Sequence, residues 1–332
     1  MSTFRAYVID KTDTGSRGAW ADLAEASLDP GTVTIRTAYS SVNYKDALAA
    51  TGQGAIVRRF PCVGGIDLAG VVMRSDDARF EAGDRVIATS YDIGTAHHGG
   101  YAEVARIPAD WVVPLPEGVS LFEAMALGTA GYTAALGILR MEENGLAPGN
   151  GKVIVSGATG GVGSLAVDIL AGLGYTVVAL TGKADQRGFL EGLGAAEVML
   201  RSALDLSRIR PLDKGLWAGA VDNLGGDVLA WMTSTMKQNG TIASVGLAAS
   251  ASLNTTVMPF ILRGVNLLGV DSGYTAMALR RRVWHRLATD MRPRHLAELA
   301  RTIAFDELPG VFDEFITGRA HGRVVVSINP QT

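Results

Sequence analysis

A glycine-rich turn that could bind an anionic ligand lies within residues 153–164, which read Val-Ile-Val-Ser-Gly-Ala-Thr-Gly-Gly-Val-Gly-Ser. Gly157, Gly160 and Gly163 lie between an apolar strand pattern and a helical pattern. Glycine at this spacing lets the backbone turn tightly, approach a pyrophosphate and pack the helix on the strand. The free N–H groups of a helix starting at Gly161 would hold the diphosphate of a dinucleotide. A turn that serves only packing is the alternative, and the flanking strand and helix favour the dinucleotide.

The end of the next expected strand indicates which dinucleotide binds. An acidic side chain there would bind the ribose hydroxyls of NAD. The chain instead reads Thr176-Val-Val-Ala-Leu-Thr-Gly-Lys183, with no carboxylate before Asp185. Thr181 and Lys183 suit a 2′-phosphate, and Arg201 after the third strand adds a further positive charge. The pattern predicts NADPH, and the alternative for Lys183 is a solvated loop lysine.

Alternating strands and helices surround this turn. From residue 121, two helical patterns at 121–127 and 129–142 lead into a βα alternation typical of a doubly wound parallel sheet. The strands expected in that sheet are 152–156, 176–180, 197–200, 218–222, 241–245 and 266–271. An α/β class is therefore predicted for this region.

The first 120 residues have a different texture, with short strand patterns separated by Gly, Pro and Asp turns. One short helix is expected there, over residues 43–50. The last helix and strand patterns have the texture of this first region, so we expect the chain to return to it. The predicted domains are therefore a β-rich domain from 1–123 and 298–332, and a dinucleotide-binding domain from 124–297.

Composition excludes several classes of function. The chain has 332 residues, of which 48% are hydrophobic, and a formal net charge of −3. With a pI near 6.0, it offers no general basis for nucleic-acid binding. No apolar stretch approaches the ~20 residues of a membrane helix, and the first residues lack a signal-peptide pattern. A lone cysteine, Cys62, suits a reducing compartment and a packed core position. We expect a cytoplasmic protein that binds neither nucleic acid nor membrane.

Short motifs are spread over essentially the whole chain. They are Ser41-Val-Asn-Tyr-Lys-Asp46, Gly65-Ile-Asp-Leu-Ala-Gly-Val-Val72, Gly83-Asp-Arg-Val86, Gly99-Gly-Tyr-Ala-Glu103, the turn described above and Gly322-Arg-Val-Val325. Together they resemble the quinone oxidoreductase branch of the medium-chain dehydrogenase/reductase superfamily. Within it, residues 43–46, 256–263 and 268–272 are similar to the NADPH-dependent acrylyl-CoA reductases.

This resemblance implies a GroES-like substrate domain built from both chain ends and a Rossmann NADP-binding domain, with the nicotinamide in a cleft beside it. It also implies a homodimer in which strand 265–271 pairs with its symmetry mate. The cofactor contacts that it implies are Tyr44 near the nicotinamide, Thr159, Gly160, Gly161 and Val162 on the diphosphate, Thr181, Gly182, Lys183 and Arg201 on the adenosine phosphate, and Leu247, Ile261 and Ser272 nearer the nicotinamide. Arg323 is a further candidate phosphate contact, with a surface ion pair as the alternative.

The metal site of related alcohol dehydrogenases is expected to be absent. The positions that match its first cysteine and its histidine are Asn43 and Ile66, and zinc needs convergent nitrogen or sulfur donors. His97 and His98 form an adjacent pair in a loop rather than a ligand frame. Without a Lewis acid, reduction of a conjugated double bond is the more natural chemistry.

In such a reduction, negative charge develops on a carbonyl oxygen, and hydrogen-bond donors stabilise it. The candidate donors are Asn43 and Tyr44, and Tyr44 or water would supply the proton. Asn43 could also serve as a helix N-cap with Asp46, while Asp67 is expected to be a buried acceptor.

The predicted reaction is reduction of a short 2-enoyl-CoA, with acrylyl-CoA as the preferred substrate. The arginine runs 58–59 and 280–282 could bind the phosphates of coenzyme A, although such runs are more often solvated faces. Quinones or free unsaturated aldehydes and ketones are alternative substrates. A protein that binds NADPH without turnover is a third possibility.

Overall fold

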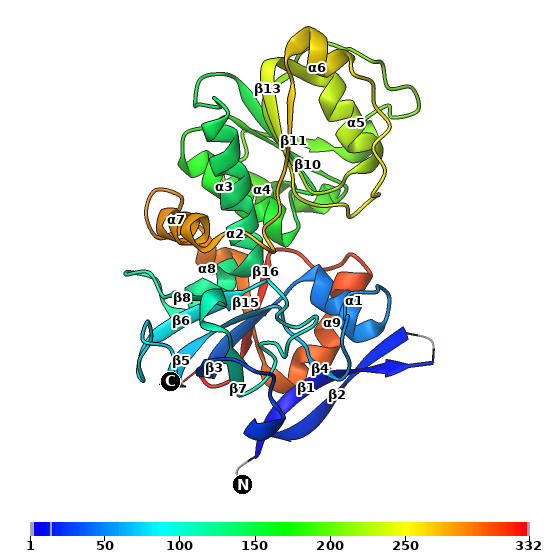
Figure 1. Cartoon of the computed structure of the whole chain (residues 1–332). Coiled ribbons are helices and arrows are strands. Elements are labelled where there is room, and N and C mark those ends of the chain that lie inside the picture. Colours follow the sequence, from blue (N-terminus) through cyan, green and yellow to red (C-terminus); the bar gives the residue numbers. More distant parts are fainter. Residues whose placement is uncertain (1–2, 14, 331–332) are drawn as a thin grey trace. The chain divides into compact units, whose positions relative to one another are not determined.

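A computed structural model describes residues 3–13 and 15–330 of the chain (Figure 1). The chain divides into two compact units. The first, here called the β-rich unit, runs to Thr129 and also contains Gly273–Arg281 and the chain from Leu296 onward. The second, the α/β unit, contains Ala130–Ser272 and Arg282–His295.

Two sheets form the framework of the β-rich unit. The seven-stranded sheet has the order β15-β16-β3-β5-β6-β8, with β7 also paired to β3, and the three-stranded sheet has the order β2-β1-β4. The strands of the larger sheet are β3 (Val33–Val42), β5 (Asp67–Ser75), β6 (Arg85–Thr89), β7 (Val104–Ile107), β8 (Val112–Pro114), β15 (Ala300–Ala304) and β16 (Arg323–Ser327), and those of the smaller sheet are β1 (Thr3–Thr12), β2 (Gly15–Ala24) and β4 (Cys62–Val63).

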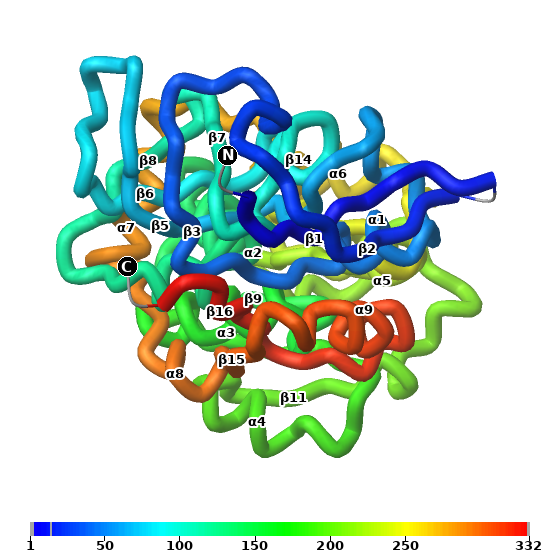
Figure 2. Tube along the Cα trace, turned by 90° about the horizontal axis from the view of Figure 1, so that it is seen from below, coloured from blue at the N-terminus to red at the C-terminus, as the bar shows by residue number. Residues whose placement is uncertain are grey.

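The two ends of the chain meet in this unit, as the sequence predicted. Strand β16 pairs with β3 in antiparallel register, with Val325 opposite Ser41. Helix α9 (Leu308–Ile316) lies against α1 (Tyr44–Thr51), and the late chain can be followed beside the early chain in Figure 2. Phe312 of α9 packs on Tyr7, with their ring centroids 5.7 Å apart. The short helix α8 (Leu296–Leu299) leads into β15.

A six-stranded sheet forms the framework of the α/β unit. Its order is β11-β10-β9-β12-β13-β14, and all of its strand pairs are parallel. This order reverses direction between β9 and β12, which is the doubly wound arrangement that the sequence predicted. The elements are β9 (Lys152–Ser156), α3 (Gly161–Gly172), β10 (Val177–Thr181), α4 (Arg187–Gly192), β11 (Glu197–Leu200), β12 (Trp217–Asp222), α5 (Gly226–Thr235), β13 (Met236–Ser244), α6 (Met258–Arg263) and β14 (Asn266–Gly269).

Helix α2 (Leu121–Glu143) departs from the sequence prediction in its apolar character. The two helical segments expected at 121–127 and 129–142 are confirmed: they meet at a kink at Gly128, whose φ of 51° and ψ of −155° are not helical, within one 23-residue element. The helix is long and apolar enough to meet the length and composition of a membrane span, contrary to the expectation that no such stretch exists. Its most apolar window is 83% buried inside the protein, as in a core helix.

The division between the units differs from the expected boundaries at three places. Residues 124–129, 273–281 and 296–297 belong to the β-rich unit rather than to the dinucleotide-binding unit. At the second place, the cause is Arg280 of α7 (Met277–Ala288), whose buried guanidinium donates to Thr89 O at 3.2 Å and to Gly273 O at 3.0 Å. A buried guanidinium needs such acceptors, and the β-rich unit supplies them.

Candidate functional sites in the two units

The glycine-rich turn connects β9 to α3 in the α/β unit. Helix α3 begins at Gly161, with Gly160 as its N-cap. A Cβ on Gly163 would lie 2.3 Å from Gly157 O, so only glycine fits where the helix crosses the turn. The first-turn N–H groups of α3 therefore stand at the carboxyl end of β9, where an anion can approach them. Thr159 lies on this turn and Val162 in the first turn of α3. Their contact with a diphosphate stays a prediction.

Lys183 and Arg201 follow the ends of the neighbouring strands β10 and β11. The Lys183 amide donates to Thr181 Oγ1 at 3.0 Å, which folds the end of β10 into a tight turn. A Cβ on Gly182 would lie 3.9 Å from Arg201 Nη2, so the Arg201 guanidinium lies beside this turn. Burial lowers the pKa of Lys183, and Asp185 partly opposes that effect. The structure thus places the Arg201 guanidinium beside the turn formed by residues 181–183. Contact of these residues with an adenosine phosphate stays a prediction.

The three residues expected near the nicotinamide lie on three segments of the α/β unit. Leu247 follows β13 and is 66% exposed, and Ile261 on α6 is 73% exposed. Ser272 Oγ accepts a hydrogen bond from Thr133 Oγ1 at 2.7 Å. Their role in cofactor binding stays a prediction.

A buried carboxylate organises the candidate site of the β-rich unit. Asp67, at the start of β5, is fully buried. It accepts hydrogen bonds from Ser41 Oγ at 2.6 Å, Asn43 Nδ2 at 2.8 Å, and Thr129 N and Oγ1 at 2.9 and 2.5 Å. The expectation that Asp67 is a buried acceptor is confirmed. It joins β3, the start of α1 and α2.

Asn43 is the N-cap of α1, and its amide group is committed to the protein. Its two Nδ2 hydrogens point to Asp67 Oδ2 at 2.8 Å and to Asp46 Oδ2 at 3.2 Å. Its Oδ1 accepts from Arg323 Nη1 at 3.2 Å. Because an amide nitrogen has only two hydrogens, a donor role toward substrate would require the loss of one of these bonds. The geometry therefore favours the capping alternative for Asn43.

Arg323 at the start of β16 is not on the surface, which corrects both expectations for it. The residue is 2% exposed. Its Nε donates to Ala126 O at 2.9 Å, its Nη1 to Asn43 Oδ1 and its Nη2 to Ser41 Oγ at 3.0 Å. A surface ion pair is excluded by this burial, and a phosphate contact is not supported because protein oxygens use these donors. Its charge is linked to Asp67 through Ser41 and Asn43.

A second buried carboxylate lies beside this network. Asp46 accepts from the amides of Asn43 and Ile66, each at 2.9 Å. Burial, and then the negative charge of Asp67, raise the pKa of Asp46 to about 7. The pKa of Tyr101 is raised well above its ordinary value, chiefly by burial and then by the two carboxylates. The site thus holds its acidic groups in a low-dielectric interior.

Tyr44, in contrast, faces outward. It is the first residue of α1 and is 48% exposed. Since Asn43 and Asp46 fix the start of α1, the tyrosine backbone has a defined position. Of the two predicted donors, Tyr44 is the one whose side chain is accessible.

Sequence reasoning missed Gly128 and Thr129. A Cβ on Gly128 would lie 2.6 Å from Asp67 Oδ2, 2.8 Å from Arg323 Nη2 and 2.8 Å from Ser41 Oγ. The single residue between the two expected helical patterns was a usable signal, because an interruption at a glycine marks a special backbone conformation.

The side chains of the candidate site do not supply the ligands that zinc requires. Among the described residues, no cluster of three His, Cys, Asp or Glu side chains could hold a metal, and the oxygens of Asp67 are already engaged. His97 and His98 are buried, and the rings of both contact backbone groups. The donor set therefore does not fit zinc.

The arginine runs considered for coenzyme A are largely paired within the protein. Arg58 pairs with Asp92 and Arg59 with Asp29. Arg280 is buried, and Arg282 pairs with Glu143. Four of the five arginines are therefore paired or buried, and Arg281 is exposed, so the runs give little support to a phosphate site.

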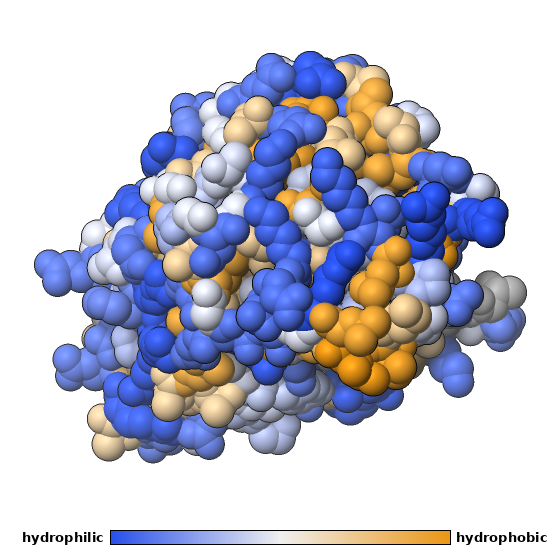
Figure 3. All heavy atoms as spheres, turned by 90° about the horizontal axis from the view of Figure 1, so that it is seen from above, coloured by the Kyte–Doolittle hydropathy of each residue, from blue (hydrophilic) through white to orange (hydrophobic). Residues whose placement is uncertain are grey.

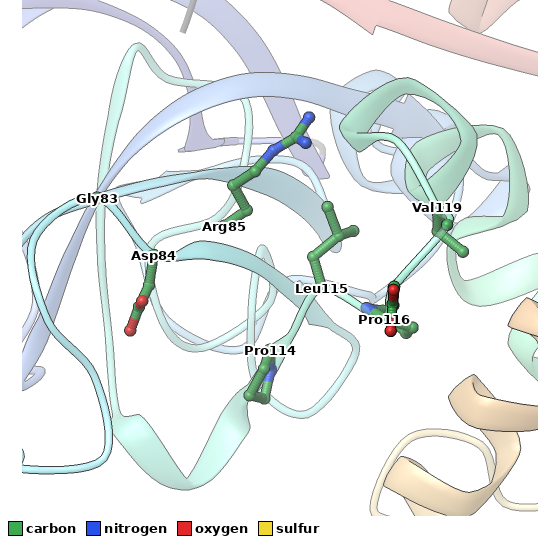
Figure 4. A pocket seen from close by; sticks show the side chains of 9 residues that line it. Gly83, Asp84, Arg85, Pro114, Leu115, Pro116 and Val119 are labelled. Carbon is green, nitrogen blue, oxygen red and sulfur yellow. The ribbon is translucent and has the colours of Figure 1, made fainter.

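A surface pocket of the β-rich unit lies elsewhere (Figure 4). It is lined by Gly83–Arg85 and Pro114–Val119. None of the predicted site residues lines it, and we assign it no role in the reaction.

The fold and these sites define a two-unit dinucleotide-binding protein of the oxidoreductase type. The family model for the alcohol dehydrogenase GroES-like domain matches residues 29–117, and that for zinc-binding dehydrogenases matches residues 161–289. The chain belongs to the medium-chain dehydrogenase/reductase superfamily, as the sequence motifs predicted.

Three similar proteins match nearly the whole chain. The acrylyl-CoA reductase AcuI of Ruegeria pomeroyi is 45% identical over 98% of this chain and 99% of its own. The yhdH oxidoreductase from Salmonella enterica, solved in complex with NADP, is 44% identical, with a TM-score of 0.95 over 98% of this chain and 99% of that one. The Bacillus subtilis protein yhfP, solved with NAD bound, is 44% identical, with a TM-score of 0.96 over 98% of this chain and 100% of that one.

Proposed function

We propose that this chain catalyses NADPH-dependent reduction of the C=C bond of a short 2-enoyl-CoA, with acrylyl-CoA converted to propanoyl-CoA. The observation that carries the proposal is the 45% identity to an acrylyl-CoA reductase over 98% of the chain. The donor set without zinc-type ligands supports it as well, because alkoxide stabilisation in alcohol oxidation would rely on a Lewis acid.

NADPH is the proposed cofactor because the Arg201 guanidinium, after β11, lies beside the turn after β10 that carries Lys183. One of the similar structures contains NADP and another NAD, so this pair of cations carries the choice. The double variant Lys183→Ala/Arg201→Ala should raise the Kd for NADPH at least tenfold and leave the Kd for NADH within about twofold. Equal losses for both nucleotides would contradict the assignment.

When bound, NADPH supplies a hydride for the β-carbon of the enoyl thioester. The Tyr44 hydroxyl donates a hydrogen bond to the thioester carbonyl oxygen as negative charge develops there, and one such donor contributes about 2.7 to 4 kcal/mol. Asn43 acts by holding the first turn of α1, and therefore the backbone of Tyr44, through Asp67 and Asp46. Tyr44 or a water molecule supplies the proton for the α-carbon.

One observation favours the alternative, in which the substrate is a quinone or an enone. Arg58, Arg59 and Arg282 are paired with carboxylates and Arg280 is buried, which leaves the exposed Arg281 as a weak basis for binding the phosphates of coenzyme A. A small uncharged substrate would need no such charges. The two hypotheses therefore differ in whether coenzyme A contributes to binding.

Steady-state NADPH oxidation with acrylyl-CoA, crotonyl-CoA, acrolein and a naphthoquinone distinguishes them. We expect the highest kcat/KM with acrylyl-CoA, and a preference for the quinone would contradict the proposal. Tyr44→Phe should lower kcat about 10²-fold or more. The matched control is Tyr274→Phe, at a tyrosine that is 56% exposed and lies outside the proposed machinery. NADPH binding without turnover of any substrate would favour a non-catalytic role.

We also propose that the protein is a cytoplasmic homodimer joined along β14. This strand is at the edge of the six-stranded sheet. Apolar side chains are exposed on the segment before it: Leu247, Leu253, Val257, Met258, Ile261 and Leu262. Figure 3 shows apolar groups gathered at the surface on one face of the molecule. Exposed patches of this kind mark interfaces. Light scattering should give twice the chain mass, and Val257→Asp should shift the mass toward the monomer.

A further inference from the structure

A short loop lies between two proposed cofactor segments of the α/β unit, at the point where its strand order reverses. Residues 223–225 connect the end of β12, at Asp222, to α5, next to the glycine-rich turn after β9. A Cβ on Gly157 would lie 3.4 Å from Asn223 Cβ, so the loop and the turn are in close contact. In doubly wound sheets, ligands bind at this reversal point.

Asp222 fixes the loop on the side of the glycine-rich turn. Its side chain is fully buried. It accepts hydrogen bonds from Ser156 Oγ at 2.7 Å, from Leu224 N at 3.2 Å and from Gly225 N at 2.8 Å. Ser156, the last residue of β9, also accepts at its Oγ from Asn223 N at 2.9 Å and at its O from Asn223 Nδ2 at 2.7 Å.

The backbone of the same loop fixes the segment after β13. Asp222 O accepts from Val245 N at 2.9 Å, and Asn223 O accepts from Ala248 N at 3.2 Å. Leu224 O accepts from Ala249 N at 2.9 Å. This segment carries Leu247, a proposed nicotinamide contact. The loop therefore connects the segment that would bind the diphosphate to a segment that would bind the nicotinamide end.

We propose that Asp222 is a positioning residue for the dinucleotide, which sets the glycine-rich turn and the segment 245–250 at the spacing that the bound cofactor needs. The proposal rests on the proposed cofactor binding. Its carboxylate accepts hydrogen bonds from the Ser156 hydroxyl and from two backbone amides, which are uncharged donors, and together these bonds order the connection between β12 and α5. Removing the carboxylate would leave the amides of Leu224 and Gly225 without this acceptor, and the loop would lose its preorganised position.

The test compares Asp222→Asn and Ser156→Ala with the control Asp168→Asn. Asp168 is also fully buried in the α/β unit and accepts from His295 N at 2.9 Å, but it lies within α3, away from the loop. The Kd for NADPH is measured by titration of nucleotide fluorescence, at a temperature where circular dichroism shows every variant folded. Thermal denaturation gives the stability of each variant separately.

We expect Asp222→Asn to raise the Kd at least tenfold and Ser156→Ala to raise it about threefold. Asp168→Asn should leave the Kd within twofold of the wild-type value even if it lowers the Tm as much. If Asp222→Asn does not fold, Ser156→Ala carries the test. An unchanged Kd in the folded loop variants would overturn the positioning role.

Wild-type binding separates this proposal from the proposed function. If the wild type binds NADH better than NADPH, the cofactor choice is wrong, and the same comparison is made with NADH because the diphosphate is shared. If the wild type binds neither nucleotide, the positioning role is wrong as well. A tenfold loss in Asp222→Asn without any enoyl-CoA turnover would support the positioning role and contradict the proposed reaction.

Discussion

Asp67 in the β-rich unit and Asp222 in the α/β unit are both fully buried carboxylates, but they have different surroundings. Asp67 shares its network with the buried Arg323 guanidinium through Ser41 and Asn43. Asp222 accepts from a serine hydroxyl and backbone amides. Burial raises the pKa of Asp222, and these three hydrogen bonds oppose that effect. A carboxylate can therefore order several chain segments with or without a buried cation.

The comparison predicts different costs of disruption. Removing one charge from a buried network leaves the opposite charge uncompensated, which is costly. Removing a carboxylate that binds only neutral donors leaves unsatisfied hydrogen-bonding groups, which costs less. The β-rich network should thus respond most strongly in stability, whereas the loop of the α/β unit should respond in cofactor binding.

Arg323→Met should have the largest effect. We expect a loss of about 3 to 5 kcal/mol in the free energy of unfolding, because Asp67 and Asp46 lose their buried cation. Urea denaturation measures it. The control is Arg301→Met, at an exposed arginine that pairs with Glu314 and should contribute less than about 1 kcal/mol. Equal losses in the two variants would remove the distinction between the networks.

Asp46 should make stability depend on pH. Its pKa is about 7 in the folded protein and has an ordinary value of 3.8. The folded state therefore keeps a proton that the unfolded state has released, so this contribution is largest below pH 4 and falls as the pH rises to about 7. The free energy of unfolding should change by up to about 4 kcal/mol over this range, at roughly 1.4 kcal/mol per pKa unit.

Asp46→Asn should remove that dependence. Urea denaturation at pH 4.5 and pH 8 gives the change for each protein, and wild type should lose more stability than the variant. Asp313→Asn, at an exposed aspartate on α9, serves as the control and should behave as wild type. A variant that loses as much as wild type would show that another group titrates.

Gly128→Ala should lower the free energy of unfolding by about 2 to 3 kcal/mol, because the added Cβ would clash with Asp67 and Arg323 at a residue whose φ is 51°. Gly145→Ala is the matched control: it has a positive φ of 92° and nothing within 4 Å of the Cβ, so it reports backbone strain alone. Thermal or urea denaturation of both variants separates crowding from strain. If the two losses agree, crowding at the network contributes little.

Asp222→Asn should have the smallest effect on stability, about 1 to 3 kcal/mol. Asp67→Asn is its matched partner and should lose more, because Asp67 shares a network with a buried guanidinium. The two variants keep the side-chain volume, so the difference between their urea midpoints reports the surroundings. A larger loss in Asp222→Asn would reverse the comparison.

Much of the α/β unit could be predicted from the sequence. Its strands, their parallel alternation with helices, and the glycine-rich turn depend on residues that are neighbours in the chain. The strand at 152–156 was predicted at its observed bounds, while the one at 241–245 begins earlier, at Met236. Apolar periodicity marks buried strands but not how far the exposed end of a strand continues.

The site of the β-rich unit could be predicted only in part. The sequence by itself determined the superfamily and the short helix after Asn43, with Tyr44 near its start, whereas the exposure of Tyr44 came from the structure. Only the tertiary structure decided that Arg323 is buried, that Gly128 must lack a side chain and that the Asn43 amide is engaged. These outcomes depend on groups from β3, β5, α2 and β16, whose separation along the chain leaves no local pattern; their charges and volumes constrain one another only after the strands pair.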